Sequence, residues 1–404
     1  MSPREERRDK ERWDLVVVGA GPAGAATAIG ALHAEPRLRV LLLDRADFPR
    51  DKACGDGVAP HVLDLLAEAG VTGLLADRTP VDRLRLVRGG VEAERTMARP
   101  AYVVPRAVLD ARLVEAAVAA GAELRRHRVR ALHEEPGCVV LDGELPAAVV
   151  VGADGAHSVV RRALDRPRGP VALAIRGYAP VTAAHAGRQV IELGTEHQPS
   201  YAWSFDSGDG TANVGYGEVL HDDRPAPTRA ELFERLERLL PGVTAGGTDW
   251  KGHHLPLSTA WWRPRNGRVL LVGDAAGLVN PLTGEGIFYA VATGLAAGRA
   301  AAEALRRGSP ERAGALHRRS TRTILLPHLR HTALAATLTR SSRVLEAGIA
   351  AAAADQRVFD DLVELGLARG RLTPSLALGL GRALLRPPPA TRLDPRPPAL
   401  KEPA

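Results

Sequence analysis

The feature that most constrains this chain is a glycine-rich turn between an apolar run and an alanine-rich segment near the N-terminus. Residues 13–18 read "WDLVVV", as a buried parallel strand should, and "GAGPAG" follows at once. A second apolar run, "RVLLLD", ends in Asp44. This order predicts a strand–turn–helix–strand unit that binds a dinucleotide, with the pyrophosphate on helix amides and Asp44 accepting from a ribose hydroxyl. The glycines of the turn are Gly19, Gly21 and Gly24.

Two later turns follow buried strands in the same way. The stretch "VVGADGAHSVVRR" places Asp154 after an apolar run, which alone would be an ordinary capped turn. The stretch "VLLVGDAAGLVNPLTGEGIFYA" places Asp274 after another, where it can bind a polyol hydroxyl. Gly284, Gly286 and Ile287 then open a helix, whose first amides can stabilise negative charge such as that on a reduced flavin.

The rest of the chain predicts an α/β fold: a Rossmann-like binding domain, an inserted mixed or antiparallel β-sheet domain and a C-terminal helical region. We expect disordered ends at residues 1–12 and 387–404, the latter rich in proline. The expected domains are a discontinuous dinucleotide-binding domain (13–80, 101–165 and 265–300), a substrate-binding sheet domain (81–100 and 166–264) and a helical region (301–386).

Composition narrows the possible partners. The net charge of +7 is spread along the chain without basic clusters that carry aromatic residues, so we expect no nucleic-acid binding. Two cysteines, Cys54 and Cys138, make no disulfide framework and no metal pair, and we expect no metal. No apolar leader or membrane-spanning run is visible, which predicts a cytoplasmic protein with reduced thiols. The oligomeric state cannot be read.

The three motifs, in this order, resemble the FAD-dependent oxidoreductases of the aromatic-hydroxylase fold. Within that group the chain is most similar to the geranylgeranyl reductase family, which includes actinobacterial menaquinone reductases. Three further stretches carry this resemblance: "FPRDKACGDGVAP", "SYAWSFDSGDGTANVGYG" and "NPLTGEGIFYA". The hydroxylases usually have His and Asn where this chain has Gly277 and Phe288, which favours the reductases.

The resemblance implies which residues contact FAD. Arg106, at a helix start, would pair with the pyrophosphate, although alone it would be typical of a surface arginine. Val129 would use its backbone toward the adenine. The implied contacts are Ala23, Asp44, Cys54, Gly55, Gly57, Arg106, Val129, Asp274, Gly286 and Ile287.

Tyr201, Trp203 and Phe205 alternate along one predicted strand and therefore face one way. Their spacing alone favours a core face, whereas the resemblance implies a wall of a prenyl-binding pocket. The family often has proline after the phenylalanine, and Asp206 stands there in this chain, so the edge of the pocket is expected to differ.

The resemblance implies reduction of a carbon–carbon double bond in a prenyl chain by hydride from reduced FAD, with Cys54 beside the reactive face as the candidate catalytic residue. NAD(P)H or another reductase would supply electrons. The main alternative is an FAD-dependent monooxygenase of a hydrophobic or indolic natural product, and a flavoprotein without enzymatic activity is a third reading. The apolar segment 372–389 would either pack on the domain or lie on the inner face of the cell membrane.

Overall fold

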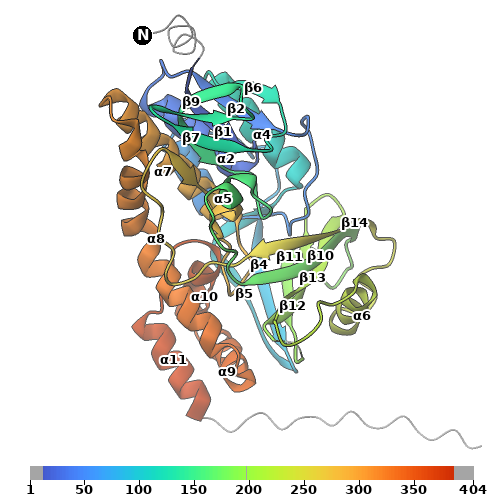
Figure 1. Ribbon diagram of the computed structural model, residues 1–404. Coiled ribbons are helices and arrows are strands. Elements are labelled where there is room, and N and C mark those ends of the chain that lie inside the picture. Colours follow the sequence, from blue (N-terminus) through green and yellow to red (C-terminus); the bar gives the residue numbers. More distant parts are fainter. Residues whose placement is uncertain (1–11, 197, 386–404) are drawn as a thin grey trace, which may run out of the picture.

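The computed structural model describes residues 12–196 and 198–385 (Figure 1). The disorder expected for residues 1–12 and 387–404 concerns segments that lie outside these ranges, except for Arg12. The described residues form two β-sheets and a set of helices, which confirms the predicted α/β class with mixed sheets and a helical C-terminal region.

The first sheet has the strand order β6-β2-β1-β9-β8-β7, and β15 also pairs with β9. Its centre is parallel, while β8 pairs antiparallel with both β7 and β9. Leu15, Val16 and Val17 of β1 are fully buried, because helices cover one face of the sheet and the β7–β8 layer and α5 lie over the other. This covering of both faces explains why the strand reads as a continuous apolar run. The strands are β1 (Trp13–Val18), β2 (Val40–Asp44), β6 (Glu123–Arg126), β7 (Leu132–Glu135), β8 (Cys138–Leu141), β9 (Leu145–Gly152) and β15 (Val269–Leu271).

The second sheet has the order β14-β10-β13-β12-β11-β4-β5-β3 and is mixed, since β11 and β4 are parallel. Helix α6 (Arg229–Leu239) covers one face through a core that contains Tyr216 and Leu236. Strand β5 extends past the boundary expected at residue 100. The strands are β3 (Gly57–Val58), β4 (Val81–Arg88), β5 (Val91–Val103), β10 (Val171–Pro180), β11 (Arg188–Leu193), β12 (Ser200–Asp206), β13 (Thr211–Val219) and β14 (Thr248–Pro256).

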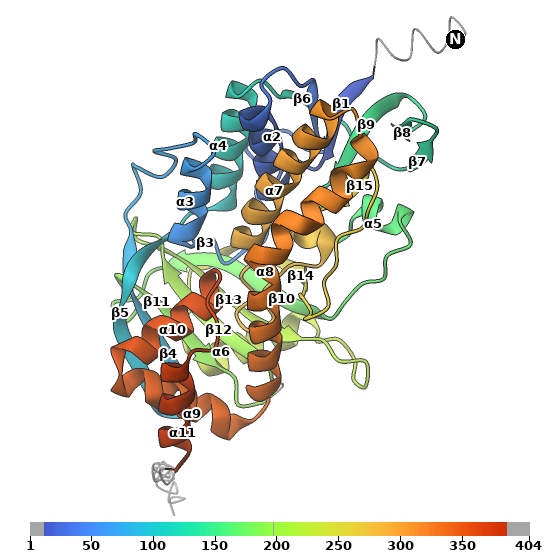
Figure 2. The same ribbon diagram turned by 90° about the vertical axis from the view of Figure 1, so that its left-hand side faces the viewer.

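Helices α2, α4 and α7 lie beside the first sheet, helix α8 descends toward the second, and α9, α10 and α11 lie beside the second sheet (Figure 2). Helix α7 lies so close to α2 that a Cβ on Gly298 would be 2.1 Å from the carbonyl oxygen of Thr27. The helices are α2 (Pro22–Ala34), α3 (Pro60–Ala67), α4 (Arg106–Ala119), α5 (Val159–Ala163), α7 (Ile287–Arg306), α8 (Ala313–Leu338), α9 (Ser342–Ala354), α10 (Gln356–Leu367) and α11 (Pro374–Leu385), with short 3₁₀ turns at Gly273–Ala276 and Pro310–Arg312.

Two arginines of the second sheet fix α9 across its other face. Arg88 is buried at the end of β4 and donates to the Ser342 hydroxyl at 2.8 Å, at the start of α9. Arg95 donates to the carbonyl oxygens of Ala352 and Ala353, at 2.8 and 2.5 Å, at the end of the same helix. With both ends held, α9 stands as a fixed wall opposite β4.

Candidate active site

A cavity of about 920 Å³ runs between the two sheets and the C-terminal helices. It is lined by the start of α2, the loop at 50–57, strand β12, the start of α7, and α9 and α10. Among the residues predicted to bind cofactor or substrate, all but Gly24 line this cavity. A Cβ on Gly24 would be 1.7 Å from the carbonyl oxygen of Gly19, so this glycine allows α2 to begin directly against the turn.

At one end of the cavity, the glycine turn exposes the start of α2. Gly19 has φ +100°, a conformation that favours glycine, and Asp44 accepts from the amide of Ala20 at 2.9 Å. A Cβ on Gly21 would lie 3.4 Å from a guanidinium nitrogen of Arg50 and 3.9 Å from one of Arg106. Because Gly21 has no side chain, a space remains between two guanidinium groups and the N-terminus of a helix. Such a space suits phosphate oxygens.

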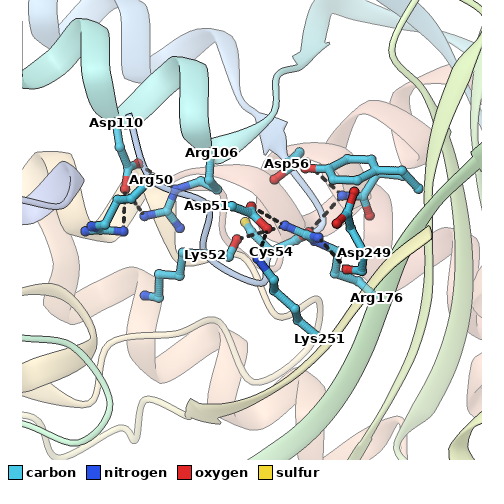
Figure 3. Close-up of polar contacts among 12 residues, drawn as sticks. Arg50, Asp51, Lys52, Cys54, Asp56, Arg106, Asp110, Arg176, Asp249 and Lys251 are labelled. Atoms are coloured by element: carbon cyan, nitrogen blue, oxygen red, sulfur yellow. Dashed lines mark hydrogen bonds and ion pairs between the residues drawn. The ribbon is translucent and has the colours of Figure 1, made fainter. Parts of the chain in front are cut away.

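A buried carboxylate holds the two arginines in place (Figure 3). Asp110 is fully buried and accepts from Arg106 at 2.6 and 2.9 Å, while Arg50 forms an ion pair with it at 3.2 Å. Arg50 also lies 3.5 Å from Asp44. Sequence analysis missed Arg50 and Asp110, although Arg50 stands in the basic stretch before Cys54, and Asp110 is one helical turn after Arg106.

The loop that contains Cys54 crosses the middle of the cavity. Burial raises the pKa of the Cys54 thiol, and the nearby positive charge of Arg106 only partly offsets this effect. The thiol is therefore protonated at neutral pH. A Cβ on Gly55 would lie 3.6 Å from the Phe205 ring and 3.7 Å from the Trp203 indole, so the loop packs directly on the predicted aromatic wall.

The third motif places two carboxylates near this loop. Burial favours a higher pKa for Asp274, but the Lys52 ammonium at 2.9 Å, together with His253 and Arg106, outweighs this effect and holds the pKa below its ordinary value. Glu285 accepts from the amide of Phe288 at 2.8 Å, and burial raises its pKa to about 7 despite this bond. Sequence analysis missed both Lys52 and Glu285 as site residues. Neither a basic residue in a loop nor a single acid between glycines shows in the sequence whether it is buried.

Asp154, from the second motif, has a structural role as well as a place at the cavity. One of its oxygens accepts from the amides of Val159 and Val160, at 2.6 and 3.3 Å, at the start of α5. Within residues 12–196 and 198–385, its other oxygen is buried and has no hydrogen-bond partner. Burial accordingly raises its pKa.

The three aromatic residues of β12 form the predicted wall at the centre of the cavity. Ring centroids are 5.8 Å apart for Tyr201 and Trp203, and 6.4 Å apart for Trp203 and Phe205. The Tyr201 hydroxyl donates to the carbonyl oxygen of Thr283 at 2.5 Å, just before Gly284. The wall is thereby tied to the glycine turn that opens α7.

Beyond the aromatic wall the lining becomes aliphatic. Leucine and isoleucine side chains of β4 and β11 face those of α9, α10, α11 and the connection between α10 and α11 across this end. The residues are Leu84, Leu86, Ile191, Leu193, Leu345, Ile349, Leu362, Leu372, Leu376 and Leu380. Sequence analysis expected the substrate in the sheet domain of residues 81–100 and 166–264 and named contacts only on β12, and it did not predict that the C-terminal helices line the cavity.

Comparison with known proteins identifies the family. The family described as "FAD binding domain" matches residues 12–323. The menaquinone reductase of Mycolicibacterium smegmatis is 35% identical over 323 residues, covering 74% of this chain and 77% of that protein. Digeranylgeranylglycerophospholipid reductase 1 of Methanopyrus kandleri is 34% identical over 312 residues, covering 72% and 81%. The chain belongs to the geranylgeranyl reductase family of FAD-dependent oxidoreductases.

Solved structures share the fold at lower identity. A geranylgeranyl bacteriochlorophyll reductase-like protein of Thermoplasma acidophilum has a TM-score of 0.75 at 20% identity, covering 92% of this chain and 96% of that one. PqsL of Pseudomonas aeruginosa, in complex with 2-aminobenzoylacetate, has a TM-score of 0.65 at 22% identity, covering 87% and 100%. The predicted family, fold and FAD dependence are thus confirmed.

The charged end of this oxidoreductase fits FAD. Gly21 leaves room beneath Arg50 and Arg106 for phosphate oxygens, and Asp44 ends β2, the position at which a carboxylate binds a ribose hydroxyl in dinucleotide-binding folds. A Cβ on Gly286 would be in ordinary van der Waals contact with the side chains of Val279 and Asp274, at 3.5 and 3.6 Å, and Gly286 and Ile287 line the cavity at the start of α7. Which atoms of FAD each residue contacts stays a prediction.

Proposed function

We propose that this oxidoreductase saturates carbon–carbon double bonds of a prenyl chain, such as the side chain of menaquinone or a geranylgeranyl group. One observation carries the proposal: a single cavity joins a charged, dinucleotide-binding end to an aliphatic end, across Cys54 and the aromatic wall. An apolar, flexible chain suits the aliphatic end, because burying its methylene groups releases about 0.8 kcal/mol each. Relatives named menaquinone reductase and digeranylgeranylglycerophospholipid reductase support the same class of substrate.

We propose that the charged end holds FAD as follows. Arg50 and Arg106 bind the pyrophosphate above Gly21, and Asp44 accepts from the adenosine ribose. Asp274, kept anionic beside Lys52, accepts from the ribityl chain. Ala23, Gly55, Gly57, Val129, Asp154, Gly284, Gly286 and Ile287 complete the binding surface.

The middle of the cavity is where the reaction would occur. Bound and reduced, FAD supplies a hydride, and a proton must reach the other alkene carbon. Tyr201, Trp203 and Phe205 exclude water and orient the chain. The Cys54 thiol, whose raised pKa keeps its proton, is the residue that we propose beside the reacting carbons. Electrons would come from NAD(P)H or from another reductase.

We propose that separate ranges of the chain form the FAD site and the substrate site. Residues 13–80, 101–165 and 265–300 bind FAD, and residues 81–100 and 166–264 provide the sheet wall of the substrate site. The cavity lining adds α9 and α10, from the helical region 301–386, to the substrate site. The substrate would therefore lie between the second sheet and these helices.

The decisive experiment is an anaerobic assay with the dithionite-reduced flavoprotein. Menaquinone and geranylgeranyl diphosphate are offered separately, and products are read by mass spectrometry. Gains of 2 Da support reduction of double bonds. A product that appears only with oxygen, and that gains 16 Da, would replace the proposal by the monooxygenase alternative.

Cys54→Ala tests the role of the thiol. We expect FAD to bind with unchanged stoichiometry while alkene reduction falls about a hundredfold, as for loss of a general acid. Cys138→Ala, in β8 outside the cavity lining, is the matched control. Full activity of the Cys54 variant would leave that residue with a packing role.

We also propose that exposed leucines of α8 and α11, near the aliphatic end of the cavity, dock on a membrane surface. Leu334 and Leu338 of α8 are 51% and 41% exposed, and Leu378 of α11 is 62% exposed. Leu338 also lines the cavity, so an apolar chain could enter there from lipid. Exposed Arg340 and Arg382 lie beside these leucines in the sequence and would meet anionic headgroups. Within the described residues, no helix combines the length and apolar character needed to cross a bilayer.

A further inference from the structure

The stretch "ANVGYG" on β13 carries a buried asparagine whose role the proposed function does not explain. Asn213 is fully buried, and its amide nitrogen donates to the carbonyl oxygen of Cys54 at 2.9 Å and to the Asp56 carboxylate at 2.8 Å. Its amide oxygen accepts from the indole nitrogen of Trp203 at 2.8 Å. The indole can only donate and the Cys54 carbonyl can only accept, so the orientation of the amide is fixed.

The glycine two residues later completes the arrangement. Gly215 faces Trp203 across the antiparallel pair of β13 and β12. A Cβ on Gly215 would lie 2.3 Å from the indole ring and 2.3 Å from the carbonyl oxygen of Ile175. The indole therefore occupies the space that a side chain at position 215 would fill, while Asn213, on the same face of β13, accepts from its N–H group.

The loop on the other side of the indole is held at several points. Asp56 has φ +59° and is fully buried, and its carbonyl oxygen accepts from the amide of Val104 at 2.8 Å. Its carboxylate also accepts from the Tyr178 hydroxyl at 2.6 Å. Earlier in the loop, Arg176 donates to Asp51 and to the carbonyl oxygen of Lys52, at 2.5 and 3.2 Å (Figure 3).

Asn213 is the group that joins this loop to the aromatic wall through side-chain hydrogen bonds on both sides. Arg176 and Tyr178 hold the loop from β10, and neither has a hydrogen bond to Trp203 among the described residues. Without the Asn213 amide, the Trp203 N–H and the Cys54 carbonyl lose these hydrogen bonds, while Asp56 keeps the Tyr178 hydroxyl. Losing a buried hydrogen bond is costly because the polar group stays desolvated.

We infer that Asn213 is a positioning residue that fixes the Cys54 backbone and the Trp203 indole relative to each other. The loop that faces the flavin and the wall that faces the substrate then keep one spacing. The catalytic purpose of this spacing rests on the proposed function, but the link between loop and wall does not. A test that reads the loop directly can therefore fail or succeed independently of the reductase activity.

The test is the rate at which iodoacetamide alkylates Cys54 in the full-length flavoprotein, followed by mass spectrometry. Cys138, in the same molecule, is the internal reference. We expect Asn213→Leu to raise the Cys54 rate about tenfold, because losing these hydrogen bonds favours local opening, and to leave the Cys138 rate unchanged. Ser204→Ala, on the opposite face of β12, should leave both rates unchanged.

Exchanging the residues at positions 213 and 56 distinguishes a specific loss of hydrogen bonds from misfolding. Asn213→Asp puts two carboxylates together and should raise the Cys54 rate further. The double variant Asn213→Asp with Asp56→Asn restores an amide opposite a carboxylate but leaves the Cys54 carbonyl without its donor, so its rate should fall below that of Asn213→Asp and stay above that of the native chain. Equal Cys54 rates in the native chain and in a folded Asn213→Leu variant would overturn the inference. So would a double variant no slower than Asn213→Asp alone.

The same variants separate this inference from the proposed function. If Asn213→Leu raises the Cys54 rate and no variant reduces a prenyl substrate, the link stands and the proposed reaction falls. If the native chain is an active reductase, we expect Asn213→Leu to lower kcat more than it raises KM, since the aliphatic end that binds the chain is untouched.

Discussion

The two ends of the cavity differ in the side chains that line them: one end is charged and the other is aliphatic. At the dinucleotide end, Arg50, Arg106, Asp44 and Asp110 form an ion-pair network around the start of α2. At the far end, β4 and β11 face α9 and α10 with aliphatic side chains. Buried charges demand exact partners, because an unpaired one is costly, whereas aliphatic side chains accept any apolar group that fits.

This difference predicts which end of the cavity tolerates substitution and which does not. A substitution at the charged end should act on stability and on FAD. A substitution at the aliphatic end should act on the choice of substrate and spare FAD. The loop that contains Cys54 and the Trp203 side chain lie between the two ends of the cavity, and Asn213 joins them by hydrogen bonds.

The largest expected effect follows from removing Arg106. Arg106→Leu leaves Asp110 buried with Arg50 as its remaining ion-pair partner among the described residues, and we expect the free energy of unfolding to fall by about 3–5 kcal/mol. FAD binding should weaken as well. Arg112→Leu is the matched control, because Arg112 on the same helix pairs with an exposed Asp77, and a surface pair contributes about 0–1 kcal/mol. Chemical unfolding measures both, and equal losses would contradict the comparison.

A smaller effect should follow from filling the aliphatic end. Gly348 of α9 lines the cavity, and a Cβ there would meet nothing within 4 Å. We expect Gly348→Leu to lower kcat/KM for a long prenyl substrate about thirtyfold, while the affinity for FAD and the fold persist. Gly381→Leu on α11 is the control, since that glycine is equally open but does not line the cavity. Both leucines should favour their helices by about 0.5–1 kcal/mol. Unchanged use of long substrates by Gly348→Leu would remove the aliphatic end from the substrate site.

Charging the exposed leucines tests whether the aliphatic end faces a membrane. We expect the double variant Leu334→Glu with Leu378→Glu to bind vesicles containing anionic lipid about tenfold more weakly, because it loses apolar burial and gains negative charge. Flotation with liposomes measures this. Val118→Glu, on α4 at the opposite end of the molecule, is the control (Figure 2). Equal flotation of all three proteins would refute docking through α8 and α11.

The smallest effect concerns the residue between the two ends. Burial raises the pKa of Asp56 to about 6 from 3.8, against the lowering influence of Tyr178 and Arg176. The folded state therefore holds this proton more tightly than the unfolded chain, which favours folding at acid pH, and the benefit is lost as pH rises through 6. Between pH 5 and pH 8, we expect the stability of the native chain to fall by about 1.4 kcal/mol relative to Asp56→Asn. Parallel stability curves would contradict this assignment.

Much of the cofactor half could be predicted because its signals are local. A glycine turn between a buried strand and a helix appears as contiguous letters, and Asp44 follows at the end of the next strand. The short strands β6, β7 and β8 were not predicted, since strands of four residues carry little periodicity. Alternation predicted that Tyr201, Trp203 and Phe205 share one face of a strand and by itself favoured a core face, whereas the pocket wall was predicted only from the family resemblance.

By itself, the sequence determined the family, the α/β class, the FAD-binding turns and the aromatic strand, because each is written in neighbouring residues. Only the tertiary structure decided that Asp110 shares two arginines, that Lys52 meets Asp274 and that Asn213 joins Cys54 to Trp203. It also decided that α9 and α10 close the aliphatic end. The physical reason is distance along the chain: Lys52 and Asp274 are 222 residues apart, and such pairs leave no periodic trace in a single sequence.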